Sequence, residues 1–503
     1  MEIGRTQRNI MLAITVAGFI LLRFWRIDVA CQWFDEIFSV HAAQQNWGDL
    51  FGFVAADLIH PPLFYVVLKL WIGIGGESVF WLRALPAMFA ILSLPPLIWL
   101  VRVLKLPTLT APFAILFLTF NGSILKYSQE VRMYSMLMCL SLFSAWLFAR
   151  YYIKGKSFVP LLILNCFLVY THYFGWFVVV SEIVAILMFQ RMKWRRMVLM
   201  FGVLAAIFAP WAVAVYSASE AGGVAQNIGW MQRPGIRQIV TLIFNLIEPI
   251  YYQATSVDPI SDVKVALPIL VITTLSIAWL IVKNKALIMS ETDALRSLSM
   301  LFAVPLVIAL TLSCISPFSV WGTRHLIIVF APFAVISAFA ILRLPKAWMQ
   351  TASVTLIVLF SGYGLVNGLT SVPTVAPWCE WNSAAAKFAE QRSDTERLYV
   401  FEDLAAYHAW FTLKDTNSAI IKVNGTAVKE DKAYFLPRRF DAVNVVNVED
   451  INEPSIFVAF RTSRFEATAS PLAELSQLGY RIEKMEPMSA EPTRTFLVRL
   501  IKN

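Results

Sequence analysis

Residues 79–101 read VFWLRALPAMFAILSLPPLIWLV and are followed directly by Arg102 and, three residues later, by Lys105. An α-helix rises about 1.5 Å per residue, so about 20 apolar residues cross the ~30 Å hydrocarbon core of a bilayer. The stretch therefore predicts a membrane-spanning helix. Because basic residues flanking a span favour the cytoplasmic side, this helix is expected to end at the inner face.

The same pattern recurs along the chain. Basic clusters follow several other apolar runs, for example Lys154 with Lys156 and Lys283 with Lys285, and Arg5 and Arg8 precede the first run. Placing these clusters inside requires eleven crossings, with the N-terminus in the cytoplasm and the C-terminal part outside. The expected spans are 9–27, 79–101, 108–126, 133–153, 157–171, 174–190, 197–216, 264–283, 297–315, 323–343 and 349–370.

The overall composition excludes several classes of protein. Apolar residues make up 58% of the chain and charged residues only 15%, whereas a soluble protein is about a quarter charged. A soluble enzyme, a disordered chain and a collagen are therefore excluded. The net charge of +9 does not indicate a nucleic-acid partner, because most Lys and Arg lie in short clusters between the spans.

The last part of the chain differs in composition. From Ser371 onward there are 16 Lys and Arg against 18 Asp and Glu, which gives a net charge of −2 and leaves +11 for the residues before it. We therefore expect a transmembrane module over 1–371 and a separate soluble α/β domain over 372–503. Hydrophobic periodicity predicts helices at 382–391 and 472–478, and strands at 397–401, 418–423, 456–460, 481–482 and 495–501.

The outer face is expected to carry a long first loop over residues 28–78. Residues 60–75 (HPPLFYVVLKLWIGIG) are apolar, but they are short for a span and hold Lys69 in the middle. They predict a helix lying in the outer interface, and residues 237–252 invite the same interpretation. Cys31 and Cys379 both fall on outer segments, so a disulfide between them is possible.

Asp35 and Glu36 form a pair of adjacent carboxylates within Trp33-Phe34-Asp35-Glu36-Ile37-Phe38, just outside the first span. One interpretation is a carboxylate that takes an acceptor proton or ligates a divalent cation. The other is an acidic pair that stabilises the start of the next helix. The sequence leaves both open.

Further titratable residues fall on the same outer side. Each has a bland interpretation as well: His60 stands in a helix-starting His-Pro-Pro turn, the arginines could snorkel to the interface, and a lone histidine is usually a satisfied hydrogen-bonding residue. Together they describe an outward-facing site with acids for proton or metal chemistry and arginines for an anion. The residues are His60, Arg83, Glu130, Arg132, His172 and Arg324.

These residues resemble a known family in their order and common side. The stretches are Asp35-Glu36, His60-Pro61-Pro62-Leu63, Arg83, Tyr127-Ser128-Gln129-Glu130-x-Arg132-x-Tyr134, Tyr170-Thr171-His172-Tyr173-Phe174 and Thr323-Arg324-His325. Over about residues 10–345 the chain is similar to the polytopic GT-C glycosyltransferases that use polyprenyl-phosphate sugars. These include the protein O-mannosyltransferases and the aminoarabinose transferases. The chain lacks the inserted luminal domain of the eukaryotic mannosyltransferases, which leaves the acceptor open.

The resemblance implies a role for each position. Asp35 would orient or deprotonate the acceptor, with Glu36 supporting it or binding metal. Glu130 and His172 would hold a divalent cation such as Mg or Mn. The phosphate of the donor would be bound by Arg132, Arg324, Arg83 and His60, and the site would also be lined by Gln129, Tyr134 and Tyr173.

The expected function is inverting transfer of a sugar from a polyprenyl-phosphate donor to a hydroxyl of a lipid, polysaccharide or protein at the outer face of a bacterial inner membrane. Membrane lipid is the expected surrounding partner, and no nucleic acid is expected. Two alternatives remain: a transporter or flippase of a lipid-linked sugar, and a polysaccharide ligase. A transporter would favour polar groups near the midplane and repeated halves, which the sequence does not display.

Overall fold

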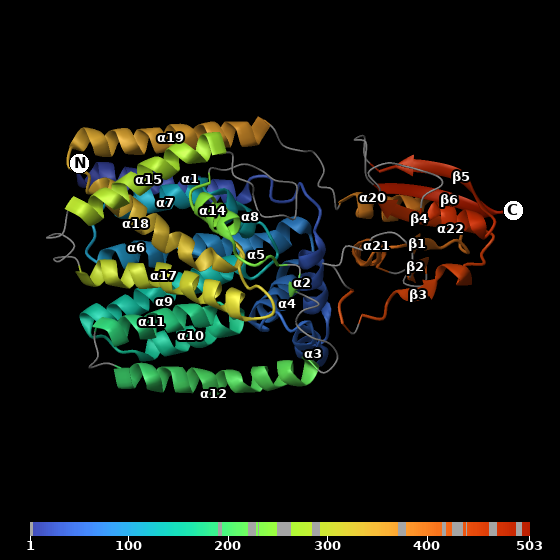
Figure 1. Ribbon diagram of the computed structural model, residues 1–503, viewed down its shortest axis with the longest axis horizontal. Coiled ribbons are helices and arrows are strands. Elements are labelled where there is room, and N and C mark those ends of the chain that lie inside the picture. The colour runs from blue at the N-terminus through green and yellow to red at the C-terminus, as the bar shows by residue number, and fades with distance from the viewer. Residues whose placement is uncertain are drawn as a thin grey trace.

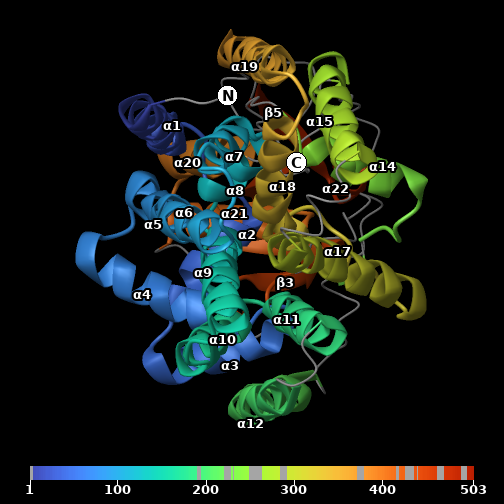
Figure 2. The same ribbon diagram turned by 90° about the vertical axis from the view of Figure 1, so that its left-hand side faces the viewer.

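The computed structural model describes residues 4–189, 194–219, 228–229, 231–248, 263–283, 292–370, 379–414, 419–424, 436–438, 440–461, 470–488 and 495–503. These residues form a bundle of long helices with an α/β domain at one end (Figure 1). The first outer loop lies between the two parts. Seen along the bundle, the helices pack side by side in a broad cluster (Figure 2).

Each of the eleven expected spans coincides with one helix or two consecutive helices. At eight of these spans, in the described part of the chain, the helix or helix pair is long and apolar enough to cross a membrane. Three are shorter, namely α7, α10 and α11, so the number of crossings stays a prediction. The helices are α1 (Arg5–Phe24), α5 (Val79–Leu92) with α6 (Leu94–Val103), α7 (Thr110–Phe120) with α8 (Gly122–Ser128), α9 (Tyr134–Lys154), α10 (Val159–Thr171), α11 (Gly175–Phe189), α12 (Trp194–Ala218), α15 (Val263–Lys283), α17 (Thr292–Ile315), η3 (His325–Val329) with α18 (Phe330–Leu342), and α19 (Ala347–Thr370).

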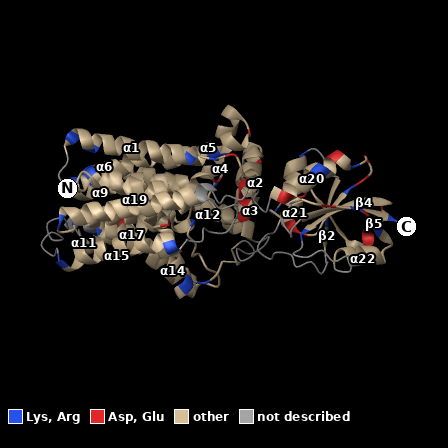
Figure 3. Ribbon diagram, turned by 90° about the horizontal axis from the view of Figure 1, so that it is seen from above, with Lys and Arg blue, Asp and Glu red and all other residues tan. Residues whose placement is uncertain are grey.

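Charge is distributed unevenly along the bundle. Lys and Arg gather at the end that holds the N-terminus, and acidic residues are more frequent toward the α/β domain (Figure 3). The helix α9 ends at this basic end with Lys154 and is capped by Gly155, whose φ of 61° suits a residue without a side chain. This arrangement agrees with the basic clusters from which the orientation was predicted.

The first outer loop forms three short helices across the other end of the bundle: α2 (Phe34–Gln44), α3 (Trp47–Asp57) and α4 (Leu63–Gly75). The helix predicted over 60–75 is therefore present from Leu63. Lys69, the polar residue in its middle, donates to the backbone carbonyls of Ala43 and Gln45 at the end of α2. The second predicted interfacial helix is present as α14 (Ile236–Asn245), and the end of that prediction falls outside the described residues.

The C-terminal domain holds a six-stranded sheet in the order β3-β2-β1-β4-β6-β5. Strands β1 to β4 run parallel where they pair, whereas β6 is antiparallel to β4 and β5. The expected mixed α/β fold is confirmed, and the boundary at 371/372 falls outside the described residues. The elements are α20 (Cys379–Gln391), β1 (Leu398–Val400), α21 (Asp403–Leu413), β2 (Ile420–Asn424), β3 (Asn444–Asn447), η5 (Val448–Asp450), β4 (Ser455–Arg461), α22 (Leu472–Gln477), β5 (Tyr480–Pro487) and β6 (Thr495–Lys502).

The α/β domain is docked onto the first outer loop. Cys31 and Cys379 form a disulfide, 348 residues apart in sequence. His41 Nδ1 of α2 lies 2.9 Å from the Tyr407 hydroxyl of α21, and Arg438 donates to the carbonyl of Ala56. Helix α21, which the sequence analysis did not anticipate, thus packs on its sheet and on α2 at once. Burial on two sides explains why its sequence has no single apolar stripe.

Three polar side chains tie α9, α10 and α11 together inside the bundle. Ser144 Oγ lies 2.6 Å from both Asn165 Oδ1 and Glu182 Oε1, and Asn165 Nδ2 lies 2.9 Å from Glu182 Oε2. A hydroxyl has one hydrogen and can donate in only one of its contacts. Whichever way the amide is turned, all three contacts are hydrogen bonds only if Glu182 is protonated. This tie supplies the partners that the deep carboxyl needs.

Glu182→Gln is expected to leave thermal stability nearly unchanged, because a carboxamide donates and accepts as a protonated carboxyl does. Glu182→Leu is expected to lose about 1–3 kcal/mol, because it leaves the buried Asn165 amide without that partner. Melting curves of the two variants in detergent test this. If the Gln variant were as unstable as the Leu variant, Glu182 would be charged rather than protonated.

Candidate active site

The two adjacent carboxylates at the start of α2 point to different places. Both lie in the first turn of the helix. The carboxylate of Glu36 is buried and accepts four hydrogen bonds, from the Trp33 and Val131 backbone N–H groups and from two nitrogens of Arg83. For Glu36 the interpretation as a helix-start residue describes its contacts, since it caps α2 and holds Arg83. Its acceptor capacity leaves little room for an acceptor hydroxyl or a metal ion.

Arg83 is the partner of Glu36 and is fully engaged. Its Nε and Nη2 donate to the Glu36 carboxylate at 2.9 and 2.8 Å. Its Nη1 donates to the carbonyls of Ile27 and Ala30, and its Nη2 also donates to the carbonyl of Cys31. All five N–H groups of the guanidinium are thus used within the protein. These contacts give no support to the prediction that Arg83 binds phosphate; they hold the chain between α1 and α2.

Asp35 has a different partner. Its Oδ2 lies 3.2 Å from Arg324 Nη1, and both side chains are partly accessible, at 21% and 14%. Arg324 directly precedes η3, at the same end of the bundle as α2. The carboxylate predicted to take a proton and an arginine predicted to bind phosphate therefore form one ion pair, 289 residues apart in sequence.

Arg132 lies beside this pair. Its Nη1 donates to the Asp35 backbone carbonyl, to Ser39 Oγ and to the Tyr65 hydroxyl, at 3.2–3.4 Å. Its Nη2 lies 3.3 Å from both ring nitrogens of His60. Arg132 is 4% exposed, and its Nε has no hydrogen-bond partner among the described residues. Arg132 and His60, predicted as phosphate ligands, are thus brought together next to Asp35.

Three histidines meet at the same place. The His172 ring lies 5.2 Å from the ring of His60 and 5.5 Å from that of His325, measured between centroids, and Tyr134 lies 6.2 Å from His172 and from His325. Burial first, and then the charge of Arg132, lowers the pKa of both His60 and His172, in the latter case to about 3. These rings are therefore neutral near pH 7.

Glu130, Gln129 and Tyr173 occupy different surroundings. Glu130 is buried, its Oε1 has no hydrogen-bond partner among the described residues, and burial raises its pKa to about 7. Gln129 donates to the carbonyls of Arg23 and Trp25 and so fixes the end of α1. Tyr173 packs on Phe208, outside the group of histidines. Of these three, Glu130 is the residue with a buried polar atom that has no hydrogen-bond partner among the described residues.

The residues predicted to hold a divalent cation do not fit one. Among the described residues no three His, Cys, Asp or Glu side chains are grouped so that they could hold a metal ion. His172 Nδ1 is already occupied, because it accepts a hydrogen bond from the Phe174 backbone N–H at 3.0 Å. The charged groups that shift the pKa of His172 are Arg132 and Arg324, and Glu130 is not among them. The predicted pair of Glu130 and His172 thus finds no ligand set in the described part of the chain and stays a prediction.

Several residues of this region were given no role by the sequence. Asp57, Tyr65 and Ser39 contact His60 or Arg132, and His325 joins the histidine group. Tyr65 and His325 stood within motifs already singled out, so proximity to them was the available signal. Ser39 lies one helical turn beyond Asp35, and Asp57 lies three residues before His60. Nothing in their residue types distinguished them from other polar residues of this loop.

The surroundings of Asp57 predict that the stability of the protein depends on pH. Burial raises its pKa to about 7, with the Asp35 charge adding to the effect and Arg132 opposing it. A carboxyl with a raised pKa keeps its proton in the folded state, so its contribution to stability is present below about pH 4 and is lost as the pH rises to about 7. The wild type is expected to lose stability between pH 5 and pH 8, and in Asp57→Asn this loss is expected to be smaller by about 2 kcal/mol. Melting temperatures at both pH values test this, and equal pH dependence in the two proteins would contradict it.

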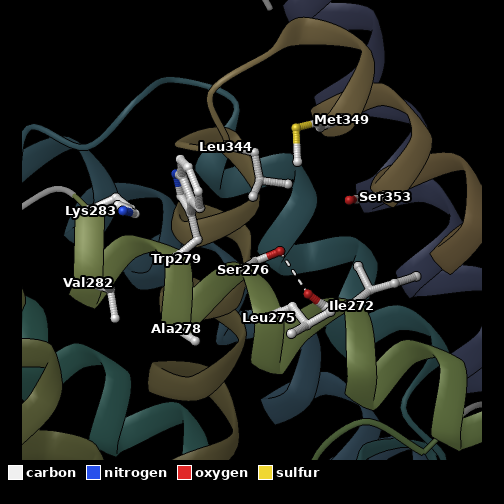
Figure 4. A pocket seen from close by; sticks show the side chains of 10 residues that line it. All are labelled: Ile272, Leu275, Ser276, Ala278, Trp279, Val282, Lys283, Leu344, Met349 and Ser353. Atoms are coloured by element: carbon white, nitrogen blue, oxygen red, sulfur yellow. Dashed lines mark hydrogen bonds between the residues drawn. The ribbon is translucent and has the colours of Figure 1, made fainter.

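A separate cavity lies between α15 and α19 and contains no acid. It is lined mainly by apolar side chains, with Trp279 and Leu344 in its wall and Lys283 at its edge (Figure 4). Lys283 ends α15. It has one titratable side chain and no carboxylate, so it lacks the acid and arginines that are grouped around Asp35.

Known structures resemble this chain over most of its length. The ArnT from Cupriavidus metallidurans bound to undecaprenyl phosphate aligns with a TM-score of 0.62 and 13% identity, covering 97% of each chain. The oligosaccharyltransferase AglB from Archaeoglobus fulgidus with an inhibitory peptide and a dolichol-phosphate aligns with a TM-score of 0.51 and 13% identity, covering 81% of this chain and 63% of AglB. An Archaeoglobus fulgidus oligosaccharyltransferase in a complex with Zn and sulfate aligns with a TM-score of 0.51 and 14% identity, covering 80% of this chain and 61% of that chain.

No protein-family model matches the sequence, and no curated protein matches it either. The structural likeness at this low identity concerns the fold. It confirms the GT-C fold, a helical membrane module followed by an α/β domain, that the resemblance implied.

Proposed function

We propose that this chain, built on the GT-C fold, is an inverting glycosyltransferase that takes its sugar from a polyprenyl-phosphate donor at the outer face of the membrane. The acceptor is a hydroxyl of a lipid, polysaccharide or protein. The observation that carries the proposal is the Asp35–Arg324 pair with Arg132 beside it. A candidate base and two candidate phosphate ligands thus share one place at the end of the bundle. The alignment with ArnT covers 97% of each chain, and that ArnT was solved with undecaprenyl phosphate, which supports the donor class.

The proposed chemistry is a single displacement. The acceptor oxygen bonds to the anomeric carbon while the bond from that carbon to the phosphate oxygen breaks, through an oxocarbenium-like state. Asp35 takes the acceptor proton. Negative charge grows on the departing polyprenyl phosphate, where Arg132 and Arg324 stabilise it. His60 orients Arg132, and Tyr65 and Ser39 fix the position of its guanidinium.

No step of the proposed chemistry is assigned to a divalent cation. The AglB solved with Zn and sulfate raises the question of a metal, but the predicted ligands of this chain do not form a ligand set. We therefore assign charge stabilisation to the two arginines, and a chelator arm in the assay below addresses metal dependence.

We further propose that the α/β domain lies outside the cytoplasm, with the protein in a bacterial inner membrane and its N-terminus inside. The Cys31–Cys379 disulfide supports this, because disulfides persist in oxidising compartments such as the periplasm. The basic residues at the opposite end of the bundle support it as well (Figure 3).

The direct test is an assay of sugar transfer by the purified full-length protein. A panel of polyprenyl-phosphate sugars is supplied with cell-envelope extract as the acceptor, with and without chelator, and release of polyprenyl phosphate is measured. We expect one donor to be turned over, with inversion at the anomeric carbon and without sensitivity to chelator. If no donor released polyprenyl phosphate, a flippase or a polysaccharide ligase would become the better assignment.

A further inference from the structure

The turn between α10 and α11 holds the His172 ring in one defined arrangement. The backbone N–H of Phe174 donates to His172 Nδ1 at 3.0 Å, and the N–H of Gly175 donates to the His172 carbonyl at 2.8 Å. The turn is tight, because a Cβ on Gly175 would come within 2.6 Å of the Leu168 carbonyl oxygen. The ring is 3% exposed and therefore has little freedom to reorient.

These contacts fix the position of the ring proton. A nitrogen that accepts a hydrogen bond carries a lone pair, so in a neutral imidazole the proton must be on the other nitrogen. Nδ1 accepts from Phe174, and the ring is neutral because burial and the charges of Arg132 and Arg324 lower its pKa to about 3. His172 Nε2 therefore carries the hydrogen and can only donate.

The Nε2–H group has no acceptor among the residues that the structure describes. The atom is buried and makes no hydrogen bond. A buried donor without a partner is costly, and such a group in a native site usually points to a bound molecule. The charged groups that act on this ring are Arg132 and Arg324, both cations and both donors. The missing partner must therefore be an acceptor, and the surrounding charge favours an anion.

We propose that His172 donates a hydrogen bond from its fixed Nε2–H to the phosphate of the lipid-linked donor, beside Arg132 and Arg324, and does not ligate a metal ion. A cation at Nε2 would require the proton to move to Nδ1, where it would face the N–H of Phe174. It would also stand among two guanidiniums. A phosphate oxygen meets none of these difficulties. The inference rests on the proposed function, because it assigns a residue to the donor site of that reaction.

Two substitutions separate the two nitrogens of the ring. Asparagine places its amide oxygen near the position of Nδ1, so His172→Asn keeps the acceptor for Phe174 and removes the Nε2–H. Glutamine places an amide N–H near the position of Nε2, so His172→Gln restores the donor. Because a hydrogen bond to a charged group is the interaction removed, His172→Asn is expected to weaken binding of undecaprenyl phosphate roughly tenfold or more. His172→Gln is expected to recover most of that loss.

Binding of undecaprenyl phosphate to the purified full-length protein, with undecaprenol as the control without phosphate, tests the inference. Each variant is first checked for an unchanged melting temperature. The inference also predicts that the ratio of the wild-type and Asn affinities is constant from pH 6 to pH 8 and does not change with chelator. Equal affinity of the wild type and the Asn variant would overturn it, as would equal losses in the Asn and Gln variants that appear only without chelator. If the wild type itself did not prefer undecaprenyl phosphate to undecaprenol, the proposed function would fail instead.

Discussion

Asp35→Asn is expected to lower the rate of sugar transfer by at least about 100-fold, because it removes the group that takes the acceptor proton. Asparagine has nearly the same shape but cannot act as a base. The affinity for undecaprenyl phosphate is expected to stay within about threefold of the wild type. The substitution leaves the charge of Arg324 unchanged, so its attraction for a phosphate is kept. Single-turnover transfer and lipid binding, measured on the same preparation, give the two quantities.

Asp28→Asn is the matched control, since Asp28 is an exposed acid on the outer side of α1. It is expected to transfer sugar at the wild-type rate. Should Asp35→Asn release polyprenyl phosphate as fast as the wild type, Asp35 would be a helix-start residue like Glu36, and the site would need another base. Loss of both transfer and lipid binding would instead indicate that the Asp35–Arg324 pair holds the site together.

Arg83→Met is expected to destabilise the protein by about 3–5 kcal/mol, because it leaves the Glu36 carboxylate buried and without its cation. The substitution also removes the donors that hold the carbonyls of Ile27, Ala30 and Cys31. The expected observation is a lower melting temperature and a smaller monodisperse fraction in detergent. Arg102→Met, at an exposed position, is expected to change neither.

Arg324→Met separates binding from folding. Its side chain is partly accessible and pairs with a partly accessible Asp35, so this change is expected to keep the fold while weakening binding of undecaprenyl phosphate roughly tenfold. If Arg83→Met were stable and lost lipid binding as Arg324→Met does, the phosphate role first predicted for Arg83 would be correct, and its contacts within the loop would be secondary.

The positions of the helices could be predicted because the bilayer imposes a length and a composition on each span. The run at 79–101 predicted a helix that is present in the structure, and its basic flank predicted an orientation. The same reasoning predicted the other spans. The first two helices of the first loop, α2 and α3, were not predicted from the sequence. In α2 the side chains from Glu36 to Ala43 are all buried, so no single apolar face marks this helix in the sequence.

The roles of Arg83 and Arg324 show where the sequence could not decide. Both are arginines at an outer membrane edge, and both allowed phosphate binding. The tertiary structure separates them, because Arg83 meets a buried carboxylate and three carbonyls whereas Arg324 meets a partly accessible one. Likewise, Asp35 and Glu36 are neighbours in the chain but successive positions on a helix point about 100° apart.

The sequence by itself therefore determined that the chain is a polytopic membrane protein, where its long apolar helices lie and that an α/β domain follows them. These properties depend on local composition and periodicity, which any short segment carries. Only the tertiary structure decided which acid pairs with a partly accessible arginine, which arginine is engaged with buried partners and which histidine nitrogen accepts a backbone hydrogen bond. Those properties depend on partners that are distant in sequence, such as Arg324 for Asp35, and on the backbone N–H that faces His172.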